Sequence, residues 1–339
     1  MIVLDVSDPR WVEFVESCQD TTPFHHPSWV TLIAECYRYK AFALARRDQE
    51  GRIVAGMPVV EVDGLCRRRR WVSLPFTDRC SPLQRCETAG AGLVEELDTA
   101  RRQAGVAQFE VRDNLVGPSA HVSPVGVRHC LRLEADLEAV YRRFKRPVRK
   151  GIARADQNNL IVRHDESRSA LTDTFYDLHV QTRRRLGVPV QPRRYFDLLW
   201  QRMIEPGRGF VLLIYYGRTP IAGAVFLAWK GTIIYKYGAS DPGYWDLCPN
   251  HLVMWTAIRW GCEQSFDTFD FGRSDLDSKG LRQFKSGWCE EQSLTYTTMS
   301  EDGSPTLRGH SYHTPGAVIR HSPVWVCRLI GKLLYRYAA

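Results

Sequence analysis

The chain has 339 residues, of which 44% are hydrophobic and 11% aromatic, so it can bury a substantial core and is not disordered as a whole. That length exceeds what one small core usually organises, and we favour two domains. The net charge of +8 and the isoelectric point near 9.0 favour an anionic partner, and they fit RNA, a nucleotide-linked substrate or an anionic membrane surface equally well.

Alternating strands and helices are predicted over the first 112 residues. The N-terminal segment contains Asp5 and Asp8 before any long apolar stretch, so it does not have the pattern of a secretion signal. No window of the chain reaches the ~18 consecutive apolar residues that a membrane-spanning helix needs. We therefore expect a cytoplasmic protein. The predicted strands are 2–6, 41–46, 53–62 and 108–112, and the predicted helices are 8–15, 29–36 and about a dozen residues from Gly92. Ser28 is expected to cap the second of these helices.

The second half repeats the order of two helices, antiparallel strands, a helix and a strand. Residues 134–154 look helical except at Pro147. The further predicted elements are a strand at 160–162, helices at 171–186 and 194–204, a three-stranded meander at 210–216, 221–229 and 232–237, a helix at 251–262 and a strand at 268–271. We find no sequence repeat between the halves, so a structural duplication is inferred from this order alone. The expected domains are residues 1–135 and 136–300.

The C-terminal segment combines a predicted loop over 301–321 with an amphipathic helix over 322–337. One side of this helix is apolar, with Val324, Trp325, Leu329, Ile330 and Leu333, and the other carries Arg328, Lys332 and Arg336. We expect the helix to pack against the N-terminal domain. The alternative is peripheral contact with an anionic membrane surface, where basic amphipathic helices of this kind can lie.

The strongest chemical signal is Lys285. The apolar run 266–271 breaks at Gly272 into a charged turn that leads to residues 280–288, and this arrangement places Lys285 beyond the end of a predicted strand, between aromatic neighbours. An ammonium with little contact to water can stabilise an anion that develops at a reacting carbonyl. The alternative is that Lys285 only caps a strand or joins a surface ion pair.

Five separated segments resemble the FemABX family of peptidyltransferases, which move an amino acid from charged tRNA onto an amine. They are the helix with Trp29, the loop 75–78, the basic helix 149–154, the segment 182–196 and the site at 284–285. In that family a Phe-Lys pair lies at the active site, and Phe284 and Lys285 match it. The resemblance implies an α+β fold of two tandem GNAT-like domains, with mixed sheets flanked by helices.

The reaction implied by this resemblance needs no cofactor, because an aminoacyl ester is already activated. The enzyme must align a neutral amine with the ester carbonyl and stabilise the tetrahedral oxyanion. Lys285 is the candidate for that stabilisation, and Phe284 would shape the pocket. Asp270 and Asp275 are candidate proton acceptors or amine orienters, with turn formation as the alternative. No metal is expected, because the histidines and the ten cysteines lack ligand spacing; we read the cysteines as small core residues.

Phosphate binding is the second requirement, because both the aminoacyl-tRNA donor and a nucleotide-linked acceptor carry phosphates. The predicted phosphate contacts are Arg149, Lys150, Arg154, Arg193 and Arg194. The other predicted substrate-binding residues are Tyr195, Trp29 and Asp78, which belong to the matched segments. In the family an arginine of the second basic segment contacts the acceptor's phosphates, and the run 183–185 fits that pattern as well as Arg193 or Arg194. A solvated basic face is the alternative reading.

The sequence also departs from the family. Peptidoglycan-directed members place a lysine beside the match to Trp29, but residues 29–33 contain none, and no coiled-coil arm for tRNA is evident. The amine-bearing acceptor is therefore left open between a cell-wall precursor and a small molecule. Two other functions compete: an acyl-coenzyme A-dependent N-acyltransferase, although Glu87 before Gly90-Ala91-Gly92 would repel that cofactor, and a non-catalytic RNA- or membrane-binding protein. No oligomeric state is predicted.

Overall fold

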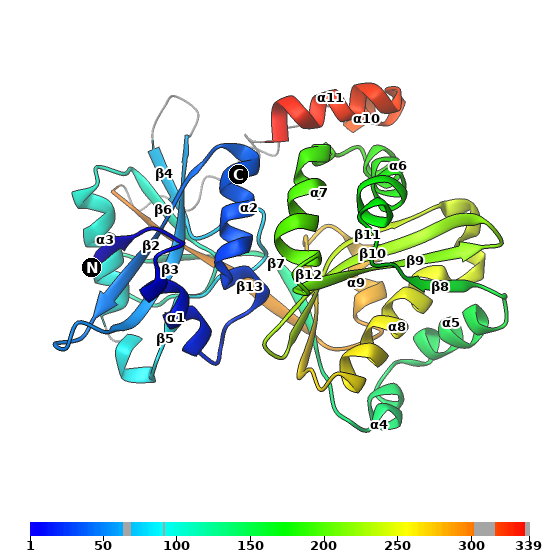
Figure 1. The fold of residues 1–339 in the computed structure, drawn as a ribbon, viewed down its shortest axis with the longest axis horizontal. Coiled ribbons are helices and arrows are strands. Elements are labelled where there is room, and N and C mark those ends of the chain that lie inside the picture. The colour runs from blue at the N-terminus through cyan, green and yellow to red at the C-terminus, as the bar shows by residue number, and fades with distance from the viewer. Residues whose placement is uncertain (64–68, 91, 302–315, 336–339) are drawn as a thin grey trace. The chain divides into compact units, whose positions relative to one another are not determined.

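The computed structural model describes residues 1–63, 69–90, 92–301 and 316–335. The described chain forms two compact units, the first from residues 1–126 and 293–301 and the second from residues 127–292 and 316–335 (Figure 1). Ala91, Arg336 and the part of the predicted loop that covers 302–315 lie outside the described residues. The rest of that predicted loop, from Gly316, is helical.

The first unit contains a mixed sheet in the order β1-β2-β3-β4-β6-β13, with β5 paired to β3. Its strands are β1 (Ile2–Leu4), β2 (Lys40–Arg47), β3 (Ile53–Asp63), β4 (Arg69–Val72), β5 (Leu83–Gln84), β6 (Gln108–Val111) and β13 (Glu291–Ser300). Only β4 and β6 run parallel, and the other neighbours are antiparallel. Phe42, Trp71 and Phe109 pack edge to face in the core on this sheet.

Among the residues that the structure describes, the α-helices that accompany this sheet are α1 (Pro9–Ser17), α2 (Pro27–Tyr37) and α3 (Leu93–Gln103). Asp8 caps α1 by accepting a hydrogen bond from the Arg10 amide. The predicted cap of α2 is wrong by two residues. His26, not Ser28, caps this helix with its Nδ1, because Pro27 takes the first helical position and needs no hydrogen-bond acceptor for a missing N–H.

The second unit has a mixed sheet in the order β7-β12-β11-β10-β9-β8. Its strands are β7 (His121–Arg132), β8 (Ile161–His164), β9 (Gly209–Tyr216), β10 (Thr219–Trp229), β11 (Thr232–Ser240) and β12 (Thr268–Ser274). The predicted meander is confirmed as β9, β10 and β11, all antiparallel, whereas β11 and β12 run parallel. A long apolar core fills the space between this sheet and its helices.

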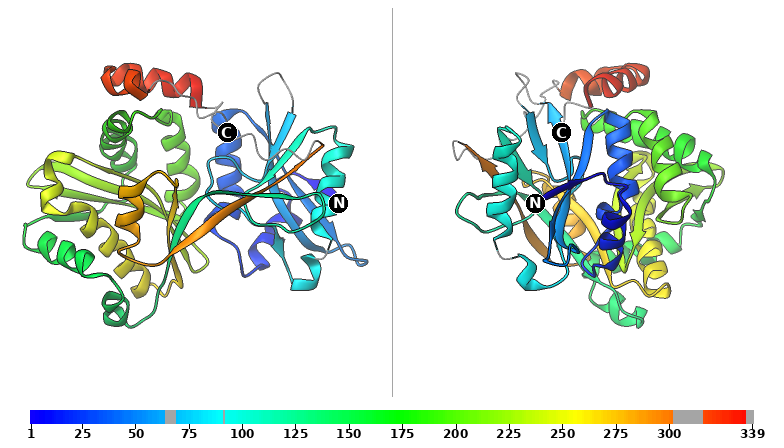
Figure 2. Two further views of the ribbon diagram at one scale, coloured as in Figure 1. Left: turned by 180° about the vertical axis from the view of Figure 1, so that it is seen from behind. Right: turned by 60° about the vertical axis from the view of Figure 1, so that its left-hand side comes forward.

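In the described part of the second unit the α-helices are α4 (Leu137–Arg142), α5 (Arg146–Asp156), α6 (Tyr176–Leu186), α7 (Arg193–Leu199), α8 (Pro249–Glu263), α9 (Lys279–Lys285), α10 (Gly316–His321) and α11 (Val324–Leu334). Helices α6 and α7 lie on one face of the sheet, and α5 and α8 lie on the other (Figures 1 and 2). Two π-helical turns, Ala170–Phe175 and Trp200–Ile204, adjoin α6 and α7.

The structure corrects several boundaries. Pro147 is the second residue of α5, which begins at Arg146, and a proline in this first turn loses no hydrogen bond. Strands β4, β5, β7 and β13 and helix α9 were not predicted. The start of β7 contains Pro124 and Gly126, and β13 is rich in Ser and Thr, so neither shows a long apolar alternation. Residues 293–300, expected in the second domain, belong to the first unit instead, where residues 297–300 pair with β6.

The C-terminal helices pack on α6 of the second unit, so the expectation that they cover the N-terminal domain is wrong. Arg328 of α11 forms an ion pair with Asp177 of α6 at 2.7 Å, and Arg320 of α10 donates to the carbonyl of Leu186. Gly331 allows this close approach, because a Cβ at that position would collide with the Val190 backbone.

Candidate active site

Lys285 is the last residue of α9, and its side chain is 3% exposed. The ammonium donates to the carbonyl oxygens of Gly272 at 2.9 Å and Arg273 at 3.0 Å. Both acceptors lie in β12, at a bulge between Asp270 and Arg273 where Gly272 adopts a φ of +71°. The bulge and the helix end together fix the position of the cation. The nitrogen is therefore held inside the protein rather than in bulk solvent.

Strands β11 and β12, the two parallel strands next to this cation, are hydrogen-bonded to each other over only part of their length. The parallel register joins residues 232–234 of β11 to residues 268–270 of β12, but β11 continues to Ser240 and β12 to Ser274. Backbone groups beyond the last pair are therefore not bonded across this strand pair. Lys285 binds β12 two and three residues past the point at which the pairing ends.

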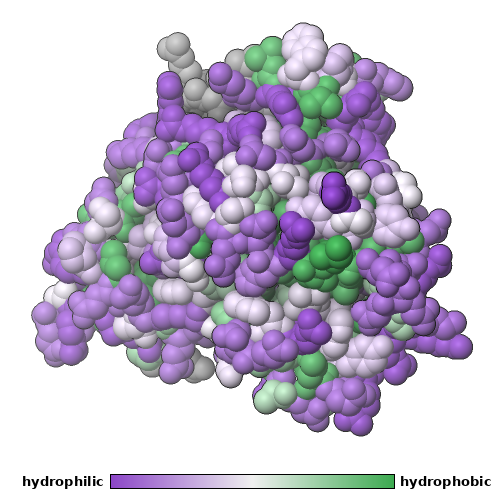
Figure 3. Space-filling view, turned by 45° about the vertical axis from the view of Figure 1, so that its right-hand side comes forward, coloured by the Kyte–Doolittle hydropathy of each residue, from purple (hydrophilic) through white to green (hydrophobic). Residues whose placement is uncertain are grey.

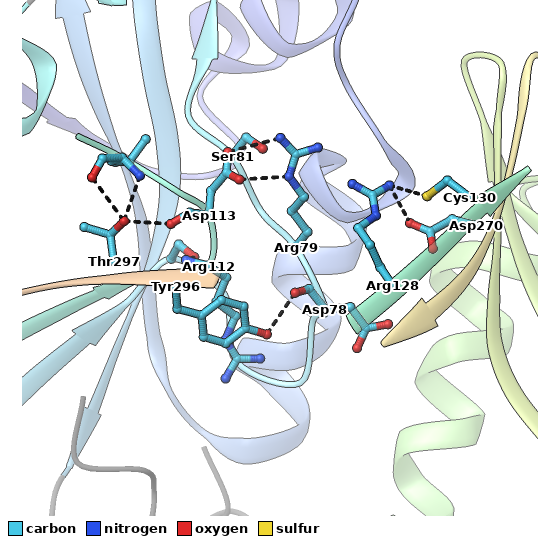
Figure 4. A network of polar contacts seen from close by, with 12 residues as sticks. Asp78, Arg79, Ser81, Arg112, Asp113, Arg128, Cys130, Asp270, Tyr296 and Thr297 are labelled. Carbon is cyan, nitrogen blue, oxygen red and sulfur yellow. Dashed lines mark hydrogen bonds and ion pairs between the residues drawn. The ribbon is translucent and has the colours of Figure 1, made fainter. Parts of the chain in front are cut away.

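Asp270 occupies the last paired position of β12. Its carboxylate accepts hydrogen bonds from the Gly272 amide at 2.8 Å and from Arg128 at 3.1 Å, and the same Arg128 nitrogen contacts the Cys130 sulfur (Figure 4). Burial and the Asp270 carboxylate raise the pKa of the Cys130 thiol to about 12. Burial likewise raises the pKa of the neighbouring Cys289 to about 12. Both thiols stay protonated near neutral pH, which disfavours a thiolate nucleophile here.

His129 is a buried residue of this cluster that the sequence reasoning missed. It is fully buried, and neither ring nitrogen has a hydrogen-bond partner among the described residues. Burial, reinforced by the nearby Lys285 ammonium, lowers its pKa to about 4, so the imidazole is neutral at pH 7. A signal was present in the sequence, because Val127, His129 and Leu131 alternate as inward-facing residues of β7.

Glu291 links this histidine to α9. Its carboxylate lies 3.7 Å from the His129 Nε2 and accepts two hydrogen bonds from Arg282 at 2.9 and 2.7 Å. The Arg282 guanidinium lowers the pKa of the Glu291 carboxyl, which stays ionised. The ion pair holds the middle of α9, and Lys285 holds its C-terminal end.

Phe284 precedes the cation and is half-buried. Its ring lies 5.2 Å from the His251 ring and 6.1 Å from the ring of Trp288, which belongs to the apolar core of the second unit. Asp275, the other predicted acid, lies apart from this cluster of contacts. Its side chain is 68% exposed and pairs with Arg273 at 2.7 Å. The structure thus brings Phe284, Lys285 and Asp270 around one bulge and places Asp275 at the surface.

The predicted phosphate-binding residues fall on two helices of the second unit. Arg149, Lys150 and Arg154 are exposed on α5, whose Val148 and Ile152 face the core. On α7, Arg193 pairs with Asp173 and lies over the Tyr176 ring. Arg194 is exposed.

Tyr195 differs from these cations because it is fully buried. Its hydroxyl accepts a hydrogen bond from the Tyr237 hydroxyl at 2.9 Å. It can therefore take part in binding only where a ligand reaches the core.

Trp29 and Asp78 belong to the first unit. Trp29 is fully buried, and its indole N–H donates to the Thr77 hydroxyl at 3.0 Å, so the ring packs in the core. The backbone carbonyl of Asp78 accepts from the Tyr296 hydroxyl at 2.8 Å, which ties this loop to β13 (Figure 4). The structure gives both residues contacts that hold the loop 75–78 in place.

No group of three or more His, Cys, Asp or Glu side chains that could hold a metal ion occurs within the described ranges. The nine cysteines of those ranges are free thiols. In the same part of the chain, no helix is both long and apolar enough to cross a membrane.

Comparison with known proteins agrees with this architecture. Residues 142–286 match the acetyltransferase (GNAT) domain family. A segment of 74 residues is 32% identical to the lipid II:glycine glycyltransferase of Staphylococcus aureus. The crystal structure of FemX superimposes with a TM-score of 0.69 and 14% identity, over 88% of this chain and 97% of that one. The chain has a FemX-like fold.

This FemX-like tandem fold is also found elsewhere. A tandem GNAT protein from the clavulanic acid biosynthesis pathway superimposes with a TM-score of 0.55 and 10% identity, over 90% of this chain and 98% of that one. The predicted α+β fold of two tandem GNAT-like domains is thereby confirmed. The S. aureus match covers only 20% of this chain and 18% of that relative, so it bears on a segment and not on the whole protein.

Proposed function

We propose that this FemABX-like protein is an aminoacyltransferase that moves an amino acid from aminoacyl-tRNA onto an amino group of a small molecule or cell-wall precursor. The observation that carries the proposal is the Lys285 ammonium, which is 3% exposed and fixed by two carbonyl oxygens where the pairing of β11 and β12 has ended. The similarity to FemX and to a lipid II:glycine glycyltransferase supports an aminoacyl group over other acyl groups.

In the proposed reaction the neutral amine of the acceptor attacks the carbonyl carbon of the aminoacyl ester. The C–N bond forms, the carbonyl electron pair moves to oxygen, and the Lys285 ammonium stabilises the resulting oxyanion. The intermediate then collapses, the ester C–O bond breaks, and the tRNA hydroxyl leaves with a proton. The proton that the amine loses goes to Asp270, with the more exposed Asp275 as the second candidate, and passes from that carboxyl to the leaving tRNA oxygen.

Two neighbours of Lys285 support this role. Phe284 is half-buried beside the cation, and its ring would limit water around the ester carbonyl. His129 is neutral at pH 7, so the site holds no second cation at that position to repel the ammonium. The two thiols nearby are protonated, which favours direct aminolysis over a covalent thioester intermediate.

The donor's phosphates require cations on the surface. The exposed Arg149, Lys150 and Arg154 on α5 are the proposed contacts for tRNA phosphates, with Arg193 and Arg194 as candidates for the acceptor's phosphates. Such contacts release counterions, so donor binding should weaken steeply as salt rises. Neutralising the three α5 cations together should lower the salt dependence.

One observation favours a second function. The family match over residues 142–286 is to acetyltransferases, which supports an acyl-coenzyme A-dependent N-acyltransferase on the same fold. The two functions share the amide product class and differ in the donor. The donor is therefore the property that an experiment must identify.

The purified protein should be incubated with a mixed pool of charged tRNA, or with acetyl- and longer acyl-coenzyme A, in the presence of a bacterial metabolite extract as the acceptor. Amide products are followed by mass spectrometry. We expect new aminoacyl amides with charged tRNA and none after ribonuclease or deacylation treatment. Transfer from coenzyme A thioesters alone would replace the proposed function by the second one.

A further inference from the structure

The outward faces of α10 and α11 carry large apolar side chains. Val318 is 49% exposed, Trp325 67% and Leu329 48%. Trp325, Leu329 and the exposed Lys332 follow one another at intervals of four and three residues, so they lie on one face of α11. An apolar stripe of this kind on a short surface helix normally faces a partner.

The helix is anchored through its other face, so the exposed stripe is not the result of a detached helix. Cys327 is 3% exposed, Gly331 is buried against Val190, and Arg328 pairs with Asp177 of α6. These contacts orient Trp325 and Leu329 away from the second unit.

Positive charge surrounds the stripe. Residues 316–335 contain Arg320, Arg328 and Lys332 but no Asp or Glu. The end of α6 adds the exposed Arg185 and Leu186, and Leu186 lies beside α10 because its carbonyl accepts from Arg320. In Figure 3, green apolar side chains appear among purple ones at the top of the molecule, where α10 and α11 lie.

We propose that this face, formed by Val318, Trp325 and Leu329 with Arg320 and Lys332, docks the protein onto an anionic lipid surface. Lipid headgroups supply the negative charge and the acyl boundary accepts the apolar side chains, which is the combination that basic amphipathic helices recognise. Helix α11 has 11 residues and a length of about 16 Å, so it can lie in the interface but cannot span a bilayer.

Two other occupants fit this face less well. A second copy of the chain would bring the same cations opposite each other in a twofold contact, and like charges repel. An RNA strand would use the cations but leave Val318 and Leu329 without an apolar partner. Lipid docking is independent of the transfer reaction, so the failure of one proposal does not affect the other.

Co-sedimentation of the full-length protein with phosphatidylcholine vesicles, with and without phosphatidylglycerol, tests the proposal. We expect binding only to the anionic vesicles, and weaker binding at high salt. The double variant W325A/L329A should reduce that binding about tenfold or more, and K332Q about fivefold. V116A, which alters an 88% exposed valine of the first unit, is the matched control and should bind as the wild type does.

Thermal unfolding of the variants must match that of the wild type, as expected for exposed side chains. Equal binding to neutral and anionic vesicles, no binding to either, or unchanged binding by W325A/L329A would overturn the proposal. A wild-type dimer in sedimentation velocity that W325A/L329A converts to a monomer, without loss of vesicle binding, would assign the face to a second copy instead.

Discussion

The replacement K285M separates the structural role of the ammonium from its proposed chemical role. The variant removes the donor for two carbonyl oxygens, those of Gly272 and Arg273, which Lys285 binds at 2.9 and 3.0 Å. A hydrogen bond from a charged donor contributes ~1.5 kcal/mol or more, so losing two should lower the free energy of unfolding by ~3 kcal/mol. The Met side chain still fills most of the space of the lysine stem.

Urea unfolding followed by circular dichroism measures this loss. The matched control is K279M, because Lys279 is an exposed lysine of the same helix, and its replacement should change the free energy of unfolding by less than ~0.5 kcal/mol. K285R keeps the charge and should lose less stability than K285M. If K285M and K279M have the same free energy of unfolding, the stability assigned to the two Lys285 hydrogen bonds is refuted.

The chemical role is measured under conditions where K285M remains folded. Removal of one group that stabilises an oxyanion typically lowers kcat by ~10²–10³-fold, and we expect a loss of that size in amide formation. A folded K285M variant that transfers as fast as the wild type would leave Lys285 with only the structural role.

Three further predictions follow from packing, charge and titration. G151A should lower stability by ~1–3 kcal/mol, because the new Cβ would lie 2.6 Å from the His251 ring, whereas G280A, with nothing within 4 Å, should not. D270N should reduce both stability and transfer far more than D275N, since only Asp270 holds the bulge amide. Lowering the pH below ~6.5 should reduce the free energy of unfolding by up to ~4 kcal/mol per pH unit. The reason is that burial lowers the pKa values of three histidines, which are therefore neutral in the folded protein and gain protons only on unfolding. These are His25 and His129, each with a pKa of about 4, and His179, with a pKa of about 3. Replacing one of them by Asn should remove about a third of that slope, whereas H321N, at an exposed site, should not; a flat profile from pH 7 to 5 would contradict this account.

Sequence patterns predicted the helices and strands whose ends are marked by nearby residues, such as turn glycines. The turn at Gly217 and the glycine at Gly231 mark the ends of β9, β10 and β11, because turn chemistry acts over a few residues. Strand β13 was missed, since its buried positions include Thr297 and Thr298, and its place depends on a partner, β6, about 190 residues earlier.

In the candidate site, too, the sequence predicted the residues that a local segment defines and missed the contacts that depend on distant strands. The Phe-Lys pair and Asp270 could be found from the sequence, because each is a chemical group in a recognisable segment. The partners of Lys285 could not, since they are backbone carbonyls exposed by a bulge, and a bulge depends on the register between β12 and β7. His129 comes near the ammonium through that same register.

The pairing of β13 with β6 of the first unit has a consequence for the synthesis and expression of the protein. Ribosomal synthesis releases β6 well before residues 297–300, which pair with it, so the edge of β6 stays unpaired while residues 127–292 of the second unit are translated. An open edge of this kind invites pairing with other chains. A fragment ending near residue 135 would keep that edge permanently, and the two halves of this protein are therefore poor candidates for separate expression.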